Sequence, residues 1–366
     1  MLTEARGLHL RRLAGALLLM SSWNLSGCSV GYLLQAAHGQ WQLLRARQPI
    51  ARLIAAPDTD AQLQRRLELV HEAREFATRE LALPDNKSYR SYSALGRPYV
   101  VWNVVAAPEF SITPLRWCFP ISGCVAYRGY FREDSARRFA ARLAQRGNDT
   151  LVAGVSAYST LGRFADPLID TMLRYGDLEL IGTIFHELAH QLVYVKNDSE
   201  FNEAFAMSVE RAGVARWLVA HNRHGELAAY QQRQEQQAQL VQLLGAGRAQ
   251  LADLYAQARL SPQSPGSQQS IAGLRARKQE LIASTTAAVR DYELQQNLRS
   301  GYGTWLDAGL NNAHLASVGT YFDCVPGFEQ LLSDQGGDFK AYYAAVRTLA
   351  HGPAASRRAW CTRLPR

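Results

Sequence analysis

Apolar residues that recur three and four positions apart indicate helices along much of the chain. One helix is predicted from about Asp177, its expected N-cap, through an apolar stripe that ends near Val193. Another is predicted after the turn at residues 196–199 and runs to about Ala220. Further helices are predicted at about residues 30–47, 61–83 and 134–146.

Strands are predicted where β-branched and aromatic residues follow one another between turn signals, at about 98–106, 125–131 and 150–158. A Gln-, Ala- and Leu-rich segment at 223–260 is broken by a Ser- and Pro-rich turn and resumes at 271–298. These two segments predict a long helical hairpin, since their leucines can pack and a disordered linker is disfavoured. The predicted fold class is α+β, mostly helical with a small sheet.

The patterns divide the 366 residues into four regions. They are a signal peptide at 1–27, an N-terminal and catalytic region at 28–222, the helical hairpin at 223–300, and a C-terminal helical part of the catalytic domain at 301–366. This length allows one large domain or two, and the apolar content of 47% is ordinary for a globular protein.

The N-terminus has the pattern of a secretory signal peptide. A basic start that includes Arg6, Arg11 and Arg12 precedes an apolar run, and the sequence Leu-Ser-Gly-Cys ends at Cys28. That ending resembles a bacterial lipobox, whose cysteine is acylated; the alternative is an ordinary signal with a coincidental cysteine. Acyl chains on Cys28 would anchor the protein to a membrane without spanning it. Because Ser29 follows, the predicted location is the bacterial cell envelope, at the periplasmic face of the outer membrane.

The formal net charge is +8 at pH 7. Loss of the signal segment, with three arginines and one glutamate, lowers it to +6. The excess comes from arginines scattered along the sequence, which do not make a nucleic-acid footprint. Nucleic acid is therefore not an expected partner.

Four cysteines remain beyond Cys28, an even number that is typical of disulfide-bonded proteins in oxidising compartments. Among the three possible pairings we favour Cys118–Cys124, closing a small loop, and Cys324–Cys361, tying down the C-terminus. Four free thiols are the alternative. Zinc binding by these cysteines is disfavoured because none belongs to a C-x-x-C pair.

The chemical signal that organises the chain is the H-E-x-x-H sequence of His186, Glu187 and His190, inside the helix predicted at 177–193. Residues four apart project from one face of a helix, so both imidazoles can bind one Zn²⁺. Glu187 would lie beside the metal as general base. The alternative is a chance match, although unpaired charges are costly to bury in an apolar helix.

Two histidines leave a zinc site short of a third protein ligand, which an adjacent helix commonly supplies as a carboxylate. Glu203 is the favoured ligand because apolar residues surround it, and a carboxylate in such company needs a partner. Glu200 and Glu210 are the competing candidates. The predicted site is one Zn²⁺ bound by His186, His190, Glu203 and a water.

Other residues are candidates to assist catalysis. Tyr321 could donate a hydrogen bond to a developing oxyanion, but a half-buried structural tyrosine is equally consistent with the sequence. Glu200 and Glu109 could hold the free α-amine of a substrate.

The remaining features have both functional and structural interpretations. The strand at 150–158 could pair with an extended peptide substrate from a sheet edge, or be an ordinary sheet strand. The adjacent Asn311 and Asn312 predict a polar role, whereas His314 is interpreted as a packed histidine and not as a ligand.

Several short stretches of the sequence resemble those of a known family. They are Leu25–Cys28 with Tyr32, Trp117–Cys124 with Tyr127–Phe131, Ala157–Gly162, His186–Gln191, Phe201–Glu203 and Asn311–Ala313. Together they resemble a family of bacterial proteins labelled "putative zinc aminopeptidases". The resemblance implies a zincin-like core and a glutamate-zincin type of site, with His186, His190 and Glu203 as zinc ligands and Glu187 as base. One departure is that only 12 residues separate His190 from Glu203, fewer than in the best-known glutamate-zincins.

The predicted function is therefore a zinc-dependent peptidase, with aminopeptidase favoured, that hydrolyses peptide bonds with a metal-activated water. A zinc endopeptidase of the cell envelope is one alternative. A non-catalytic, zinc-containing lipoprotein that acts as a binding or assembly factor is the other. Glu187 argues against the latter, because a purely structural site needs no base.

Overall fold

The computed structural model describes residues 31–119, 123–260, 271–322 and 324–362. The chain forms two compact units that divide between Ala46 and Arg47. The first unit contributes one described helix at 31–45, which confirms the helix predicted there. The predicted signal peptide and Cys28 lie outside the described residues. Within the described part, no helix combines the length and apolar character needed to cross a bilayer.

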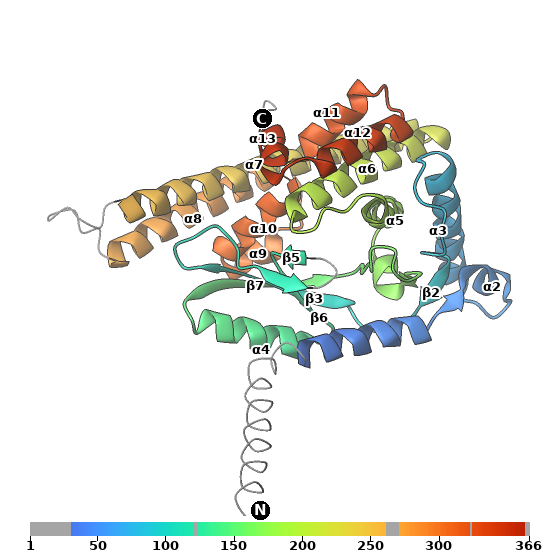
Figure 1. Cartoon of the computed structure of the whole chain (residues 1–366), viewed down its shortest axis with the longest axis horizontal. Coiled ribbons are helices and arrows are strands. Elements are labelled where there is room, and N and C mark those ends of the chain that lie inside the picture. The colour runs from blue at the N-terminus through green and yellow to red at the C-terminus, as the bar shows by residue number, and fades with distance from the viewer. Residues whose placement is uncertain (1–30, 120–122, 261–270, 323, 363–366) are drawn as a thin grey trace, which may run out of the picture. The chain divides into compact units, whose positions relative to one another are not determined.

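A three-stranded antiparallel sheet lies at the centre of the second unit (Figure 1). Its middle strand β3 (Val101–Pro108) pairs with β6 (Arg128–Tyr130) on one side and β7 (Asn148–Val155) on the other. β3 is buried along most of its length, which its Val and Ala residues favour. The strands predicted at 98–106 and 150–158 are confirmed, with ends shifted by two or three residues.

The single strand predicted at 125–131 is wrong. β5 (Gly123–Val125) pairs with β4 (Trp117–Phe119) in a small hairpin, and only β6 joins the central sheet. Cys118 and Cys124 lie opposite each other in that hairpin at disulfide-bonding distance, as predicted. The cross-link keeps β5 paired with β4, so the chain turns before it enters β6.

A second small sheet was not predicted. It contains β1 (Gln48–Pro49), β2 (Ser91–Ser93) and β8 (Leu168–Ile169), in the order β1-β2-β8. Strands of two or three residues are too short to show an alternation of apolar and polar positions. Two short helices adjoin this sheet in the chain, α2 (Ile50–Ala55) and the 3₁₀ helix η1 (Asp170–Arg174).

Helices cover both faces of the central sheet (Figure 1). α4 (Glu133–Ala144) packs on β3 and β7 from one side, close to the helix predicted at 134–146. α10 (Asn312–Phe322) packs on the other side, where Ala313 contacts Val105. α10 therefore lies between the sheet and the remaining helices.

The helix pair of α5 (Asp177–Leu192) and α6 (Ser199–Ala220) forms the next layer, with α3 (Ala61–Arg79) against α5. All three confirm predicted helices, although α3 ends four residues early. Gly176, and not Asp177, is the N-cap of α5, because Asp177 is already the first helical residue. α5 is buried along nearly all of its length, which its apolar composition requires.

The predicted hairpin is confirmed as α7 (His224–Leu260) and α8 (Ile271–Gln295), which pack against each other (Figure 1). Nζ of the buried Lys278 in α8 donates to Oδ2 of Asp149 at 2.6 Å and to the Glu109 carbonyl at 2.9 Å. α7 also packs on α6 and α10. The hairpin is thus fixed to the core by Lys278 of α8 as well as by the packing of α7.

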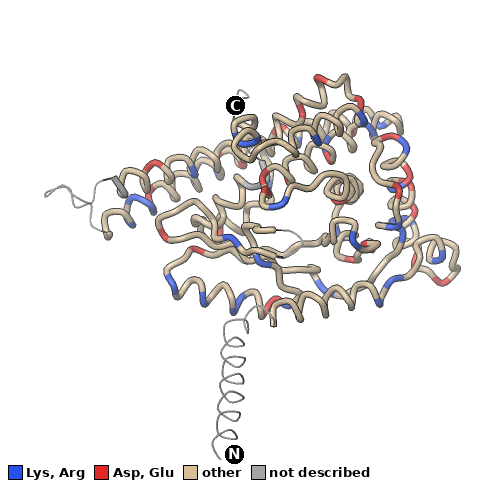
Figure 2. Tube along the Cα trace, viewed as in Figure 1, with Lys and Arg blue, Asp and Glu red and all other residues tan. Residues whose placement is uncertain are grey.

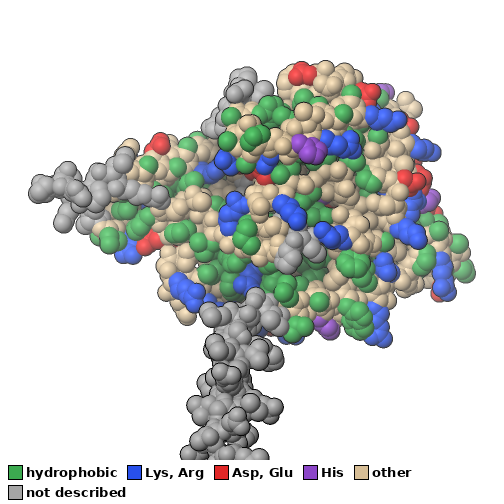
Figure 3. All heavy atoms as spheres, in the orientation of Figure 1, with side chains coloured by type: hydrophobic (Ala, Val, Ile, Leu, Met, Phe, Trp, Pro, Cys, Tyr) green, Lys and Arg blue, Asp and Glu red, His purple; other side chains and the backbone are tan. Residues whose placement is uncertain are grey.

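The C-terminal region is helical, as predicted. Its further helices are α9 (Gly303–Ala308), α11 (Val325–Asp334), α12 (Phe339–His351) and α13 (Ala354–Thr362). Cys324 and Cys361 lie at disulfide-bonding distance, which ties α13 to the start of α11 as predicted. Basic residues are dispersed among acidic and uncharged ones along the trace and on the visible surface (Figures 2 and 3).

The Asn311–Asn312 pair has a structural role in the described fold. The Asn312 side chain is fully buried, and its Nδ2 donates to the Pro108 and Glu109 carbonyls at 3.1 and 2.8 Å. Its Oδ1 accepts a hydrogen bond from the Tyr255 hydroxyl at 2.9 Å. One amide therefore joins the end of β3 to α10 and to the hairpin.

Replacement of Asn312 by leucine should destabilise the protein. The change removes three hydrogen bonds, each of which contributes about 0.5–1.5 kcal/mol to stability. The Pro108 carbonyl keeps the Ser111 N–H and the Glu109 carbonyl keeps Nζ of Lys278, so the loss comes from the bonds removed and from the Tyr255 hydroxyl. We expect the free energy of unfolding to fall by about 3 kcal/mol in urea denaturation. Gln295→Leu, on the exposed surface of α8, is the matched control and should change it by less than about 0.5 kcal/mol.

His314 should make stability depend on pH. Burial lowers the pKa of its imidazole to about 4, and Nδ1 lies 2.9 Å from Oδ1 of Asn311. The unfolded chain takes up a proton near pH 6.5 and the folded one does not, so stability falls as pH falls from about 6.5 towards 4. Between pH 7.5 and 5 we expect this group to contribute about 2 kcal/mol of that loss. Between these pH values the free energy of unfolding of His314→Gln should fall by about 2 kcal/mol less than that of the parent. An equal fall in the two proteins would contradict the assignment.

Candidate metal centre

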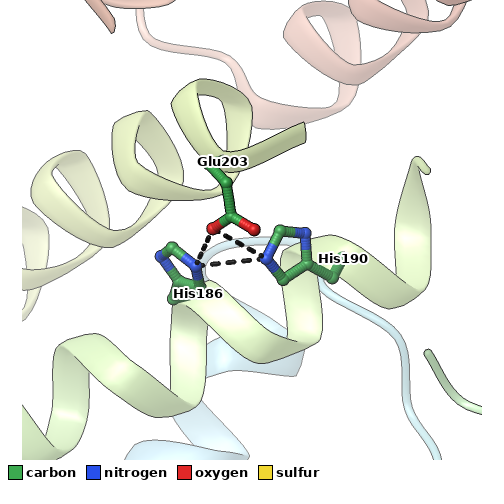
Figure 4. A group of neighbouring side chains, drawn as sticks. All are labelled: His186, His190 and Glu203. Atoms are coloured by element: carbon green, nitrogen blue, oxygen red, sulfur yellow. Dashed lines mark hydrogen bonds and ion pairs between the residues drawn. The ribbon is translucent and has the colours of Figure 1, made fainter. Parts of the chain in front are cut away.

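Three side chains from α5 and α6 bring their ligand atoms together (Figure 4). Nε2 of His186 lies 3.1 Å from Nε2 of His190 and 3.4 Å from Oε2 of Glu203. Nε2 of His190 lies 3.6 Å from the same oxygen. The three atoms form a nearly equilateral triangle, so the structure joins the residues that the sequence predicts as ligands.

The spacing of these atoms fits a metal ion. Zinc bonds of about 2.0–2.1 Å in a tetrahedron place the ligand atoms about 3.3–3.4 Å apart, which is the mean of the three observed distances. Two imidazoles and one carboxylate are also the donor set of many catalytic zinc sites, where water takes the fourth position. The site is accessible, since His186 and Glu203 each expose 15% of their side-chain surface.

Local sequence explains how Glu203 reaches the histidines. His186 and His190 project from one face of α5 because they are four residues apart. Only six residues connect α5 to α6, and the buried Asn202 clasps that connection. Its Oδ1 accepts from the Val195 backbone N–H at 2.7 Å, and its Nδ2 donates to the Val195 carbonyl at 2.8 Å. These two hydrogen bonds fix the first turn of α6 against the connection. Glu203 can therefore reach the histidines although few residues separate it from His190.

Glu210 supports His186 from the opposite side of the ring. Its Oε2 lies 3.0 Å from Nδ1 of His186, so it accepts the Nδ1 proton and leaves Nε2 free to bind a metal. Gly182, one turn before His186, makes room for this contact, because a Cβ there would lie 3.0 Å from Cγ of Glu210. Glu210 was a competing ligand in the sequence analysis; the structure places it behind the histidine. Glu200 is not part of the converging group among the described residues.

The three converging groups compensate one another electrostatically. Burial opposes ionisation of Glu203, but the charges of His190 and His186 and their hydrogen bonds hold the pKa of its carboxyl well below the usual range. Burial likewise opposes protonation of His186, and hydrogen bonds to Glu203 and Glu210 outweigh it and raise the pKa of the imidazole. The site therefore concentrates negative charge where a cation would bind.

Glu187 has the environment of a general base. It follows His186 on α5, and burial raises the pKa of its carboxyl, while the charges of His190 and His186 partly oppose that rise. A raised pKa suits a group that must accept a proton and release it again near neutral pH.

A loop distant in sequence packs beside this face of α5. Asn86 Nδ2 donates to Oε1 of Gln191 at 2.7 Å, and Gln191 Nε2 donates to Oγ of Ser88 at 3.3 Å. Tyr89, next in the loop, is buried and has a positive φ of 60°, and the charge of Glu187 contributes to raising its pKa after the larger effect of burial. These residues were not predicted from the sequence, because no local pattern links them to the motif.

Tyr194 was also missed, although spacing could have found it. It lies four residues after His190, and the two ring centroids are 6.4 Å apart. Burial, and then the charge of Glu203, raise the pKa of its hydroxyl. The side chain of the predicted oxyanion donor Tyr321 lies outside the described part of the structure. Glu109, one candidate for the substrate amine, is instead paired with Arg275 at 2.5 Å.

A surface pocket of about 680 Å³ lies at the other end of α5. Its lining includes Arg66, Tyr175 and Asp177, and none of the converging ligands. The chemistry of the converging ligands, and not the size of this pocket, therefore identifies the candidate site.

Fold and site together define a mostly helical α+β protein with a His–His–Glu group that could hold a metal ion. The model of the family described as "Putative aminopeptidase" matches residues 31–361, and the chain belongs to this family. The match confirms the aminopeptidase family predicted from the sequence and does not test the zinc. No curated protein and no solved structure matches the chain significantly.

The contact between Glu210 and His186 should strengthen metal binding. Glu210→Ala removes the acceptor that orients the imidazole, and we expect zinc affinity to fall about 10–100-fold in competition with a chelator. Glu329→Ala, which removes a glutamate paired with Arg211 outside the metal centre, is the control and should leave affinity unchanged. Equal affinities in the two variants would show that the contact does not support the metal site.

Proposed function

We propose that the protein is a zinc-dependent peptidase, and specifically an aminopeptidase. The observation that carries the proposal is the triangle of His186, His190 and Glu203, with Glu187 beside it on α5. Membership of the aminopeptidase family supports the same reaction class. A zincin-like core is part of the proposal: the motif helix α5, the ligand helix α6, and a sheet with β7 at one edge.

In the proposed mechanism His186, His190 and Glu203 hold the zinc. When bound, zinc supplies Lewis-acid chemistry by lowering the pKa of a water and polarising the scissile carbonyl. Glu187 removes a proton from the attacking water as its oxygen bonds to the carbonyl carbon. Glu187 then delivers that proton to the nitrogen as the C–N bond breaks, so the products are a carboxylic acid and an amine.

Two further roles belong to the proposal. β7 lies at an edge of its sheet, so an extended peptide could add to it by backbone hydrogen bonds. Tyr321 was chosen from the sequence as oxyanion donor, and Tyr194 is the tyrosine that lies beside His190. Removal of an oxyanion donor lowers kcat about 10²–10³-fold, so phenylalanine at each position would distinguish them.

The cellular setting is proposed from the sequence alone. Acylation of Cys28 would hold the protein at the periplasmic face of the outer membrane of a bacterial cell envelope, where peptides are its substrates. Two cysteine pairs at disulfide-bonding distance suit such an oxidising compartment. The dispersed basic residues favour no nucleic-acid partner (Figure 2).

The alternatives remain an envelope endopeptidase and a non-catalytic zinc lipoprotein that binds or assembles other proteins. Cleavage of peptides with a free α-amine and with an N-acetylated one distinguishes an endopeptidase from an aminopeptidase, because only an aminopeptidase requires the free amine. Cleavage of both at the same rate would favour an endopeptidase. Zinc binding without cleavage of any peptide in a library would favour the non-catalytic protein.

Glu187→Gln should abolish most peptidase turnover without removing the metal. The amide cannot accept the proton, so we expect kcat to fall about 10²–10⁴-fold while zinc content stays at about one per chain. Glu179→Gln, exposed on the same helix, is the control and should retain full activity. Unchanged turnover in Glu187→Gln with zinc bound would contradict the mechanism.

A further inference from the structure

The described helix of the first unit, at residues 31–45, exposes large apolar side chains. Leu33 is 48% exposed, Leu34 65% and Trp41 52%. They are three of the nine large hydrophobic residues that the described chain exposes, so this one helix carries a third of them. Such clustering on one element marks an interaction surface more clearly than isolated exposed residues would.

These side chains share one face. At about 100° per residue, Leu33, Leu34, Trp41 and the exposed Ala37 fall within an arc of about 100°. Arg45 borders this arc, and its guanidinium lies 5.0 Å from the centre of the Trp41 ring. An apolar face bordered by tryptophan and arginine is typical of helices that lie in a membrane interface.

The sequence around the helix indicates what covers this face. Leu33 lies five positions after Cys28 in the sequence, a span of at most about 17 Å. Acyl chains on Cys28 would therefore hold this face close to the bilayer surface. Residues 29–46 of the first unit contain Arg45 and no aspartate or glutamate, so the segment complements anionic headgroups.

We propose that the helix at 31–45 is a membrane-interface helix, whose face of Leu33, Leu34, Ala37 and Trp41 inserts among the headgroups of the bilayer. It supplies a second contact beside the lipid anchor, and this role rests on the proposed envelope address but not on the peptidase activity. Membrane binding strengthens with each apolar group that is buried in the bilayer, so the helix adds to the attachment that the acyl chains provide.

The test uses the chain from residue 28 onward with Cys28→Ala, which retains every described residue and carries no lipid. Its partition into vesicles of phosphatidylethanolamine and phosphatidylglycerol is measured by sedimentation. We expect the parent to bind the vesicles and the triple variant Leu33→Gln/Leu34→Gln/Trp41→Gln to bind them about tenfold more weakly. The control Tyr175→Gln/Val219→Gln/Leu294→Gln changes three exposed apolar residues elsewhere and should bind as the parent does.

Two further measurements test the role of headgroup charge and the self-association of the helix. Arg45→Glu should weaken binding to these vesicles more than to neutral phosphatidylcholine vesicles, and it leaves the apolar face intact. No binding by the parent chain, or equal binding by the triple variant, would overturn the proposal. A dimer in sedimentation equilibrium that the triple variant reduces to a monomer would also overturn it, because the face would then join two copies. The mass of the membrane-extracted protein tests acylation of Cys28 separately.

Discussion

The site depends on the way in which two imidazoles and one carboxylate, buried between two apolar helices, compensate one another's charges and hydrogen-bonding needs. α5 and α6 pack closely, and they bring an oxygen of Glu203 within 3.4 and 3.6 Å of the two imidazole nitrogens. A buried carboxylate is costly unless a positive charge or hydrogen-bond donors face it. Protons on the histidines or a divalent cation can meet that need, so metal binding and the packing of the two helices are coupled.

Close approach of the two helices requires small residues at defined points. A Cβ on Gly213 of α6 would lie 2.7 Å from the Phe185 ring, and one on Gly182 of α5 would crowd Glu210. Gly213 thus sets the separation of the helices, whereas Gly182 admits the carboxylate that orients His186. α10 and α7 pack on α6, and the buried hydrogen bonds of Asn312 join α10 to the end of β3 and to α7.

The sequence predicted the parts of the fold that local patterns determine. The periodic apolar residues of α5, α6 and the hairpin specify helices, and four-residue spacing places His186 and His190 on one face. Glu203 could be chosen because a carboxylate among apolar residues needs a partner. An even number of cysteines and their positions suggested both pairs that lie at disulfide-bonding distance.

Contacts between segments that are distant in the sequence could not be predicted. Neither Gln191 nor Asn86 carries a local signal that the two side chains meet, and Glu210 could not be placed behind His186 without the geometry of the helix pair. The predicted strand at 125–131 failed because a cross-linked hairpin competes for its first residues.

The zinc content of the purified soluble chain, measured for the parent and for His186→Ala, tests the central claim most directly. We expect about one zinc per chain in the parent and none in the variant, since two remaining ligands cannot hold the ion tightly. Absence of zinc from both, after incubation with the metal, would contradict the metal centre and the peptidase built on it.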